Sequence, residues 1–370
     1  MAEPTVTRSD LRHELCRKLG MEFFQRVGTS GTSTATGSIT TLVDATRLKQ
    51  ADDVWNGSYL YLTSTGSVRL INDFASTSGT LTWLPALGSA SGSGTTYEIH
   101  TGFTADQIHD AINSAIEDGF PEFFEVTTDE TTALTQDTLE YTLPGTPYFV
   151  LSMWLESVNE KDKGTASVDP SGSVTQLIDT SKSWDADEWN GMSVAIYHGT
   201  GKGQHAVITD TSPPDTLRIA AWLGTGTSAP DATSKYVIKD ITEEVADWHR
   251  IVAARFDQTF YPTTTYLTSR YSAHAGHSLR VVYVAKPARL TTDSSTTVVP
   301  REYIIRKALA YLHASRIGDS RADSDRHRYL QQMYESMAEV YKLQNKFRLP
   351  KSTMWIEQET VVDTPLEYPF

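Results

Sequence analysis

The sequence has 370 residues, with 46 acidic and 32 basic side chains and a formal net charge of −14. This length exceeds what one ordinary hydrophobic core needs, so we expect more than one domain. The apolar fraction of 39% excludes global disorder, and the acidic balance argues against a protein that wraps DNA or RNA through phosphate contacts.

The first predicted element is a helix over residues 8–27. Leu11, Leu15 and Leu19 recur every four residues and form its apolar side. Residues 28–38 are rich in Gly, Ser and Thr, and we interpret this stretch as a linker.

An internal repeat follows, in which residues 39–102 match residues 174–240. The matching anchors are Leu42-Val43-Asp44 with Leu177-Ile178-Asp179, Trp55-Asn56-Gly57 with Trp189-Asn190-Gly191, and Tyr97-Glu98-Ile99 with Tyr236-Val237-Ile238. Short alternating runs between turn residues are typical of antiparallel strands. Each copy is therefore predicted to be a small antiparallel β-barrel or sandwich, with Trp-Asn-Gly as a tight turn.

Between and after the copies, the pattern changes. Thr104 and Gln107 have the spacing of a capping box and predict a helix over residues 105–119. The remaining predicted elements of this part are strands at 138–143, 148–158 and 278–286, and a helix at 245–256.

Two helices are predicted near the end of the chain. The first starts after Pro300, has Ile304 and Leu309 on its apolar face, and is broken at Gly318. The second covers 323–347 at nearly coiled-coil spacing, with one apolar side. That side comprises Leu330, Met333, Met337, Val340 and Tyr341.

The last residues, 349–370, combine prolines with spaced large apolar side chains and lack a helical period. Such a sequence suits an extended arm that docks in a groove of a neighbouring molecule. The side chains expected to make this contact are Trp355, Ile356, Leu366, Tyr368 and Phe370.

We predict no catalytic, cofactor-binding or metal-binding residues, and therefore no enzyme. The run from Gly199 to Gly203 (GTGKG) lacks the spacing of a phosphate loop and is interpreted as a turn. His274 and His277 have no further ligand at metal-site spacing. Cys16 has no evident His partner, and we expect a buried, inert thiol. Without a long apolar run or a signal-peptide pattern, we also expect a non-secreted protein without a membrane span.

These predictions give an α+β fold: a discontinuous helical bundle with a small β-sheet, carrying two inserted and mutually related β-domains. The framework comprises residues 1–38, 103–173 and 241–348. The insertions are 39–102 and 174–240, and the arm is 349–370.

Within the framework, residues 278–290 (SLRVVYVAKPARL), an acidic Thr-rich loop, Val298-Val299-Pro300 and the helix that starts at Arg301 resemble the head-to-tail adaptor proteins of tailed bacteriophages. The resemblance covers about half of the chain, and the two β-insertions depart from simpler members. It implies a ring, expected to be a dodecamer, that binds the portal protein and tail or further neck proteins. DNA would pass through its lumen without sequence-specific binding, and the protein would be located at the virion's head–tail junction after assembly in the host cytoplasm.

Two other functions remain open from the sequence. One is a tail or baseplate structural protein whose β-domains bind glycan or a host surface. The other is a carbohydrate-degrading enzyme, for which only Asp52, Asp53, Asp185 and Asp187 could supply a carboxylate pair. Since these residues lie at matching places before the two Trp-Asn-Gly turns, a turn role explains them without catalysis.

Overall fold

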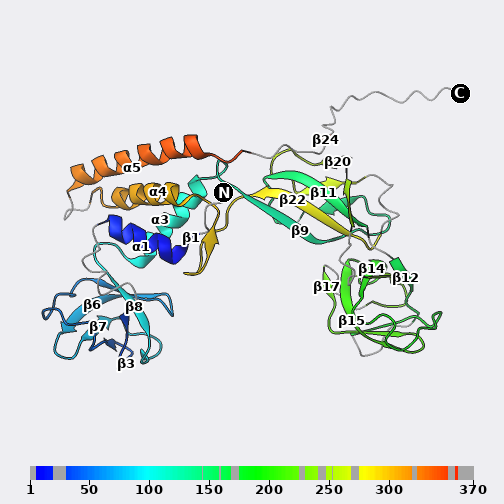
Figure 1. Ribbon diagram of the computed structural model, residues 1–370, viewed down its shortest axis with the longest axis horizontal. Helices are drawn as coiled ribbons and strands as arrows, with labels where there is room; N and C mark the ends of the chain where they lie inside the picture. Colours follow the sequence, from blue (N-terminus) through cyan, green and yellow to red (C-terminus); the bar gives the residue numbers. More distant parts are fainter. Residues whose placement is uncertain are drawn as a thin grey trace. The chain divides into compact units, whose positions relative to one another are not determined.

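The computed structural model describes residues 6–19, 31–143, 145–157, 160–167, 175–224, 230–240, 247–251, 253–267, 275–318, 323–348 and 355–356 (Figure 1). The chain divides into two compact lobes. The first lobe contains residues 1–125 and 286–348, and the second contains residues 126–285 and 349–370. Helices and largely antiparallel sheets are both present, so the protein is α+β, as predicted.

Helices that lie far apart in the sequence share the hydrophobic core of the first lobe. The described helices are α1 (Arg8–Lys18), α3 (Ala105–Asp118), α4 (Arg301–Ala314) and α5 (Ser324–Asn345). Leu11, Ile112 and Ile304 are fully buried in this core, where α1, α3 and α4 meet (Figure 1). The predicted capping box at Thr104 is confirmed. The last part of the helix predicted over 8–27 lies outside the described residues.

A seven-stranded antiparallel sheet, residues 31–100, forms what we call the first β-module. The strand order is β2-β8-β5-β6-β7-β4-β3. The strands are β2 (Gly31–Thr32), β3 (Ala35–Ser38), β4 (Thr41–Val43), β5 (Tyr59–Leu62), β6 (Ser67–Ala75), β7 (Thr80–Leu84) and β8 (Thr96–His100). Trp55, Trp83 and Tyr97 fill its core.

The second β-module, residues 160–239, repeats this arrangement in the second lobe. Its strand order is β12-β18-β14-β15-β16-β13, and β17 pairs with β15. The strands are β12 (Glu160–Thr165), β13 (Gln176–Ile178), β14 (Ser193–His198), β15 (Gln204–Ser212), β16 (Thr216–Ile219), β17 (Leu223–Gly224) and β18 (Lys235–Lys239). Corresponding strands therefore occupy the same places in the two sheets.

Corresponding polar contacts also recur in the two modules. Tyr97 donates its hydroxyl to the buried Asp44 at 2.8 Å, and Tyr236 donates to the buried Asp179 at 2.7 Å. Burial raises the pKa of both tyrosines, and the neighbouring aspartate raises it further, so both hydroxyls remain protonated donors. The repeat in the sequence thus preserves a buried hydrogen bond as well as a strand order.

The linker predicted over 28–38 is wrong for residues 31–38, which form β2 and β3. The glycine there permits close packing: a Cβ on Gly31 would lie 2.2 Å from the Tyr97 ring. Gly164 of β12 takes the corresponding place, and its Cβ would lie 2.5 Å from the Tyr236 hydroxyl. Both modules therefore begin earlier than the sequence comparison indicates, at residues 31 and 160.

The second lobe also contains two smaller sheets. One has the order β19-β11-β22-β9 and the other β10-β21-β20-β24. Their strands are β9 (Glu125–Ala133), β10 (Glu140–Thr142), β11 (Phe149–Ser157), β19 (Asp247–Ile251), β20 (Ala253–Phe256), β21 (Thr264–Tyr266), β22 (Ser278–Ala285) and β24 (Trp355–Ile356). Met153 and Val281 are fully buried in their shared core.

The helix predicted over 245–256 is wrong, because this segment contains β19 and β20. Trp248, Ile251 and Ala254 have helical spacing. However, β19 pairs along five residues with β11, a strand almost 100 positions away in the chain. Long-range sheet pairing overrides a short helical pattern of this kind.

Candidate functional site: buried docking seats and an exposed helix face

The side chain of Arg12, on α1, is fully buried and lies between two carboxylates. Its Nη2 donates to Glu98 Oε1 at 2.8 Å and its Nε donates to Glu98 Oε2 at 3.0 Å. Two further bonds, of 2.7 and 2.8 Å, reach the oxygens of Asp293. Paired planar contacts of this kind fix both distance and orientation. Arg12 therefore holds β8 of the first β-module against α1 and the loop before β23 (Thr296–Thr297).

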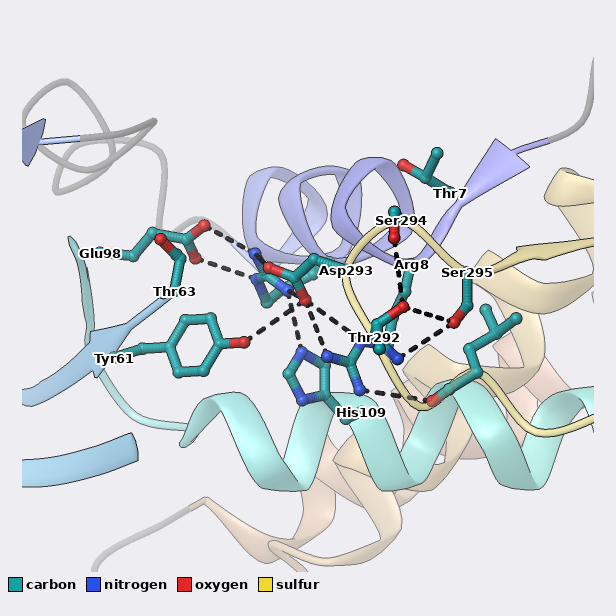
Figure 2. A network of polar contacts seen from close by, with 12 residues as sticks. Thr7, Arg8, Tyr61, Thr63, Glu98, His109, Thr292, Asp293, Ser294 and Ser295 are labelled. Carbon is teal, nitrogen blue, oxygen red and sulfur yellow. Dashed lines mark hydrogen bonds and ion pairs between the residues drawn. The ribbon is translucent and has the colours of Figure 1, made fainter. Parts of the chain in front are cut away.

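Aromatic and imidazole groups surround this cluster. Figure 2 shows Tyr61, Glu98, His109 and Asp293 converging from β5, β8, α3 and the loop before β23. The Arg12 guanidinium lies 4.8 Å from the Tyr61 ring centroid, a cation–π distance. His109 Nε2 lies 2.9 Å from Arg12 Nη1 and must accept, since a guanidinium can only donate. Burial, with the charges of Arg8 and Arg12, lowers the pKa of His109 to about 3, so this imidazole is neutral.

The acidic partners of Arg12 remain ionised. Burial would raise the pKa of Glu98, but hydrogen bonds from His100, His13 and Arg12 hold it far below its usual range. Burial would likewise raise the pKa of Asp293, but the hydrogen bond and the charge of Arg12 lower it by more. Arg12, Tyr61, Glu98, His109 and Asp293 thus form a charged junction between the first β-module and the helices. We call this junction the first seat.

Cys16 has a His partner, contrary to the sequence-based expectation. Its Sγ lies 3.9 Å from His100 Nδ1, and His100 Nε2 lies 2.8 Å from Glu98 Oε2. Thiol, imidazole and carboxylate follow the order of a nucleophile, a base and an orienting acid. However, Cys16 is 1% exposed, so in this conformation a substrate does not reach its sulfur. The arrangement belongs to the first seat.

A second junction holds the second β-module against β11. Lys239 of β18 is 4% exposed and donates to Glu156 Oε2 at 2.8 Å. The Ser278 amide donates to the same carboxylate oxygen at 2.7 Å. Burial raises the pKa of Glu156, and the charge of Lys239 lowers it by more. We call this junction, with Lys239, Glu156, Ser278 and the adjacent Gly276, the second seat.

The aspartates considered for catalysis are turn residues. The Asn56 amide donates to Asp53 Oδ1 at 2.8 Å, and the Asn190 amide donates to Asp187 Oδ1 at 2.7 Å. Asp53 and Asp187 both have a φ of 62°, a left-handed conformation that Asp tolerates. Asp52 accepts from the Ser76 amide. These contacts shape the Trp-Asn-Gly turns in both modules.

The GTGKG run connects β14 to β15, as the turn interpretation predicts. Gly199, Gly201 and Gly203 all have positive φ angles, which glycine adopts without strain. Lys202 donates to the Thr138 hydroxyl at 2.6 Å, beside a groove of about 480 Å³. The lining combines five threonines and Lys202 with Ala133, Glu140, Tyr141, Leu143 and Gly203.

One side of α5 presents an apolar stripe to solvent. Tyr329, Val340 and Leu343 are 67%, 49% and 68% exposed. With the partly buried Met333 and the polar Ser336 they follow the alternating four- and three-residue spacing of a coiled-coil seam. These five residues are called the α5 stripe below.

The other side of α5 packs on the helical core through Tyr334, Ala338 and Tyr341. The sequence-based assignment of one apolar side is therefore wrong, since Tyr341 contacts the core while Met337 and Val340 are 41% and 49% exposed. Surface helices ordinarily have one apolar side. A helix with two such sides is shaped to lie between two packing partners.

The predicted arm is only partly described. Trp355 and Ile356 form β24, which runs parallel to β20. Leu366, Tyr368 and Phe370 lie outside the described residues, as does His274. His277 is buried and bonds through Nδ1 to the Glu156 carbonyl oxygen.

Among the residues that the structure describes, no group of three or more His, Cys, Asp or Glu side chains is placed to hold a metal ion. In the same part of the chain, no helix is long and apolar enough to cross a membrane. Comparison with protein-family models and with curated proteins finds no match for this chain.

Proposed function

We propose that this chain is a structural assembly protein and not an enzyme. Its role would be that of a ring-forming adaptor that connects the portal of a tailed bacteriophage to its tail. The proposal joins the resemblance at residues 278–305 to a helical core built from distant segments and to two related β-modules, one in each lobe. Its partners are further copies of the chain in a dodecameric ring, the portal protein, tail or neck proteins, and DNA that passes through the lumen of the virion.

The observation that carries this proposal is the α5 stripe. Three large apolar side chains that are between 49% and 68% exposed are unfavourable in water, and the coiled-coil spacing of the stripe fits a packed partner. In a ring, the next copy of the chain covers such a stripe. The net charge of −14 suits a lumen through which DNA slides, because like charge prevents tight binding.

Electron microscopy of the purified protein tests the proposal, and rings are the expected result. Val340→Glu places a charge in the α5 stripe and should abolish rings while the monomer stays folded. Gln332→Glu adds the same charge to an exposed polar position of α5 and should leave rings intact. If both variants form rings equally well, the α5 stripe is not the contact between copies.

The arm has a separate test. A chain that ends at residue 348 should remain folded, because the arm contributes only the two residues of β24 to a described sheet. We expect this chain to form rings but not to join its partner in the particle. Normal particle assembly by the truncated chain would contradict a docking role.

The hydroxyl-lined groove beside Lys202 favours a second candidate, a tail or baseplate protein that binds glycan. Thr138 and Lys202 are the polar groups to test. Binding of the full chain to a glycan array, lost on Lys202→Ala with Thr138→Ala and retained on Val340→Glu, would support this alternative. The absence of glycan binding by the full chain, together with rings, would favour the adaptor.

A further inference from the structure

The two β-modules use the same face for attachment. In each module, two adjacent strands bury one side in the module's own core: β5 and β8 in the first, β14 and β18 in the second. Their other side is buried too, although it points away from that core. The outward residues at the centre of this side are at most 4% exposed: Tyr61, Glu98 and His100 in the first module, and Ala195, Val237 and Lys239 in the second. Those at its ends, Tyr59, Thr96, Ser193 and Lys235, are partly exposed.

Strand register makes these residues strictly equivalent. Tyr61 pairs with Glu98 across β5 and β8, and Ala195 pairs with Val237 across β14 and β18. His100 and Lys239 occupy the next outward position, two residues further along each strand. One face of a duplicated module thus carries different chemistry in its two copies.

The residues that contact this face differ between the two seats as the face itself does. Glu98 meets the Arg12 guanidinium in the first seat. In the second seat the charges are reversed, because Lys239 meets the Glu156 carboxylate. At the other position the Gly276 backbone closes on Val237, since a Cβ on Gly276 would lie 2.4 Å from Val237 Cγ1. The second seat therefore has no room for a carboxylate at that position.

We propose that this outer face is a recognition surface, and that its two outward positions on the last strand determine which seat a β-module binds. The first module fits a cation-bearing helix, and the second fits a carboxylate beside a closely packed glycine. Placing Glu98 and His100 on the second seat would bring a carboxylate to Gly276 and remove the cation that pairs with Glu156. A clash or an unpaired charge in the wrong seat adds to the specificity that favourable contacts in the matching seat provide.

Two chimeric full-length chains test this inference. In both, residues 31–100 replace residues 164–239, so that the junctions fall at Gly31 for Gly164 and at His100 for Lys239. Both chimeras carry Tyr61→Ala, because Ala195 is the equivalent outward residue of the second module, and the second chimera also carries Glu98→Val and His100→Lys in the graft. Docking is measured by hydrogen exchange at the Gln136 amide, which in the native chain bonds to the Tyr197 carbonyl oxygen of the second module at 3.1 Å. In both chimeras strand register places the Thr63 carbonyl oxygen at the position of this acceptor.

We expect this amide to exchange faster in the first chimera by about two orders of magnitude, the effect of an unmatched buried charge. The amide of the grafted Ile71, bonded within the module, should stay protected in both chimeras and reports folding of the graft. Equal exchange at Gln136 in the two chimeras, fast or slow, would overturn the proposal.

A test in the intact chain serves if the grafts do not fold. Lys239→Met should expose the Gln136 amide by leaving the Glu156 carboxylate without its cation, and the added change Glu156→Gln, which keeps an acceptor for the Ser278 amide, should restore its protection. Failure of the double variant to restore protection would show that the charges do not select the seat. Neither test depends on ring formation, so the outcome is independent of the proposed function.

Discussion

The first seat makes a quantitative prediction at Arg12. Arg12→Met removes four hydrogen bonds to Glu98 and Asp293 and retains much of the side-chain volume. Because the Arg12 side chain is 0% and that of Glu98 6% exposed, the stranded carboxylate is poorly solvated. Breaking a buried ion pair on one side costs roughly 3–5 kcal/mol. The first β-module should then detach from α1 more readily.

The chain's only cysteine supplies the assay. Cys16 is buried beside His100 in the first seat, so its rate of modification by a thiol reagent reports opening of this junction. The expected cost corresponds to an increase in rate of roughly 10²-fold to 4 × 10³-fold. Denaturant unfolding measured in parallel separates local detachment from global unfolding.

Arg8→Met is the matched control. Arg8 lies one turn earlier on α1 and also contacts Asp293, but its side chain is 11% exposed and it has no bond to Glu98. We expect a rise in modification rate of about tenfold or less, as for a more exposed pair. If Arg12→Met labels no faster than Arg8→Met, the reasoning about the buried junction is wrong.

Other predictions concern pH and backbone packing. Because the pKa of His109 is lowered to about 3 whereas an unfolded His titrates near 6.5, the stability contributed by neutral His109 is full above about pH 6.5 and is lost as pH falls toward 3. His109→Gln, which keeps an acceptor for Arg12, should flatten this decline by up to about 1.4 kcal/mol per pH unit in urea titrations between about pH 6 and 4; an unchanged slope would contradict the assignment. Gly31→Ala and Gly164→Ala should each lower the free energy of unfolding by about 1–3 kcal/mol through contact with the tyrosine ring or hydroxyl. Gly88→Ala, which has open space around its Cβ, should change it by no more than about 0.5 kcal/mol, and equal effects at all three positions would refute the packing argument.

The helices were predictable because their signals are local. The capping box at Thr104 and the apolar periodicity after Pro300 each lie within a few residues of the element that they specify. The repeat was detectable because its anchors are buried positions, such as Leu42, Tyr97 and Tyr236, where substitution is costly.

The misassigned segments depend on distant partners. Residues 31–38 have a linker's composition, and only the Tyr97 ring, more than 60 positions away, explains why Gly31 is a strand residue. The seats could not be predicted for the same reason: Arg12 and Asp293 are 281 positions apart. A weak signal was present, since Arg12 lies directly beside the buried Leu11 on α1, and Glu98 and His100 alternate with the buried Tyr97 and Ile99.

The use of ions at the seats has a physical consequence for folding. A β-module whose attachment face was wholly apolar would expose a hydrophobic surface before docking. Because this chain contains two related modules, such surfaces could associate with the wrong partner. Glu98 and Lys239 are well solvated before docking, and only the matching seat compensates for their dehydration. The buried ion pairs therefore make attachment specific but add little to the free energy of unfolding.

An ion pair that is buried for selectivity should show strong non-additivity at the first seat. Arg12→Met with Glu98→Leu replaces the pair by apolar groups, while Arg8 still neutralises Asp293 at 2.9 Å. The double variant should be less destabilised than Arg12→Met alone, because much of the cost of the single change is the stranded carboxylate. Urea denaturation of the two variants measures the difference. A double variant as unstable as the sum of its single changes would mean that the ion pair itself supplies the stability, and that selectivity is not the reason for its burial.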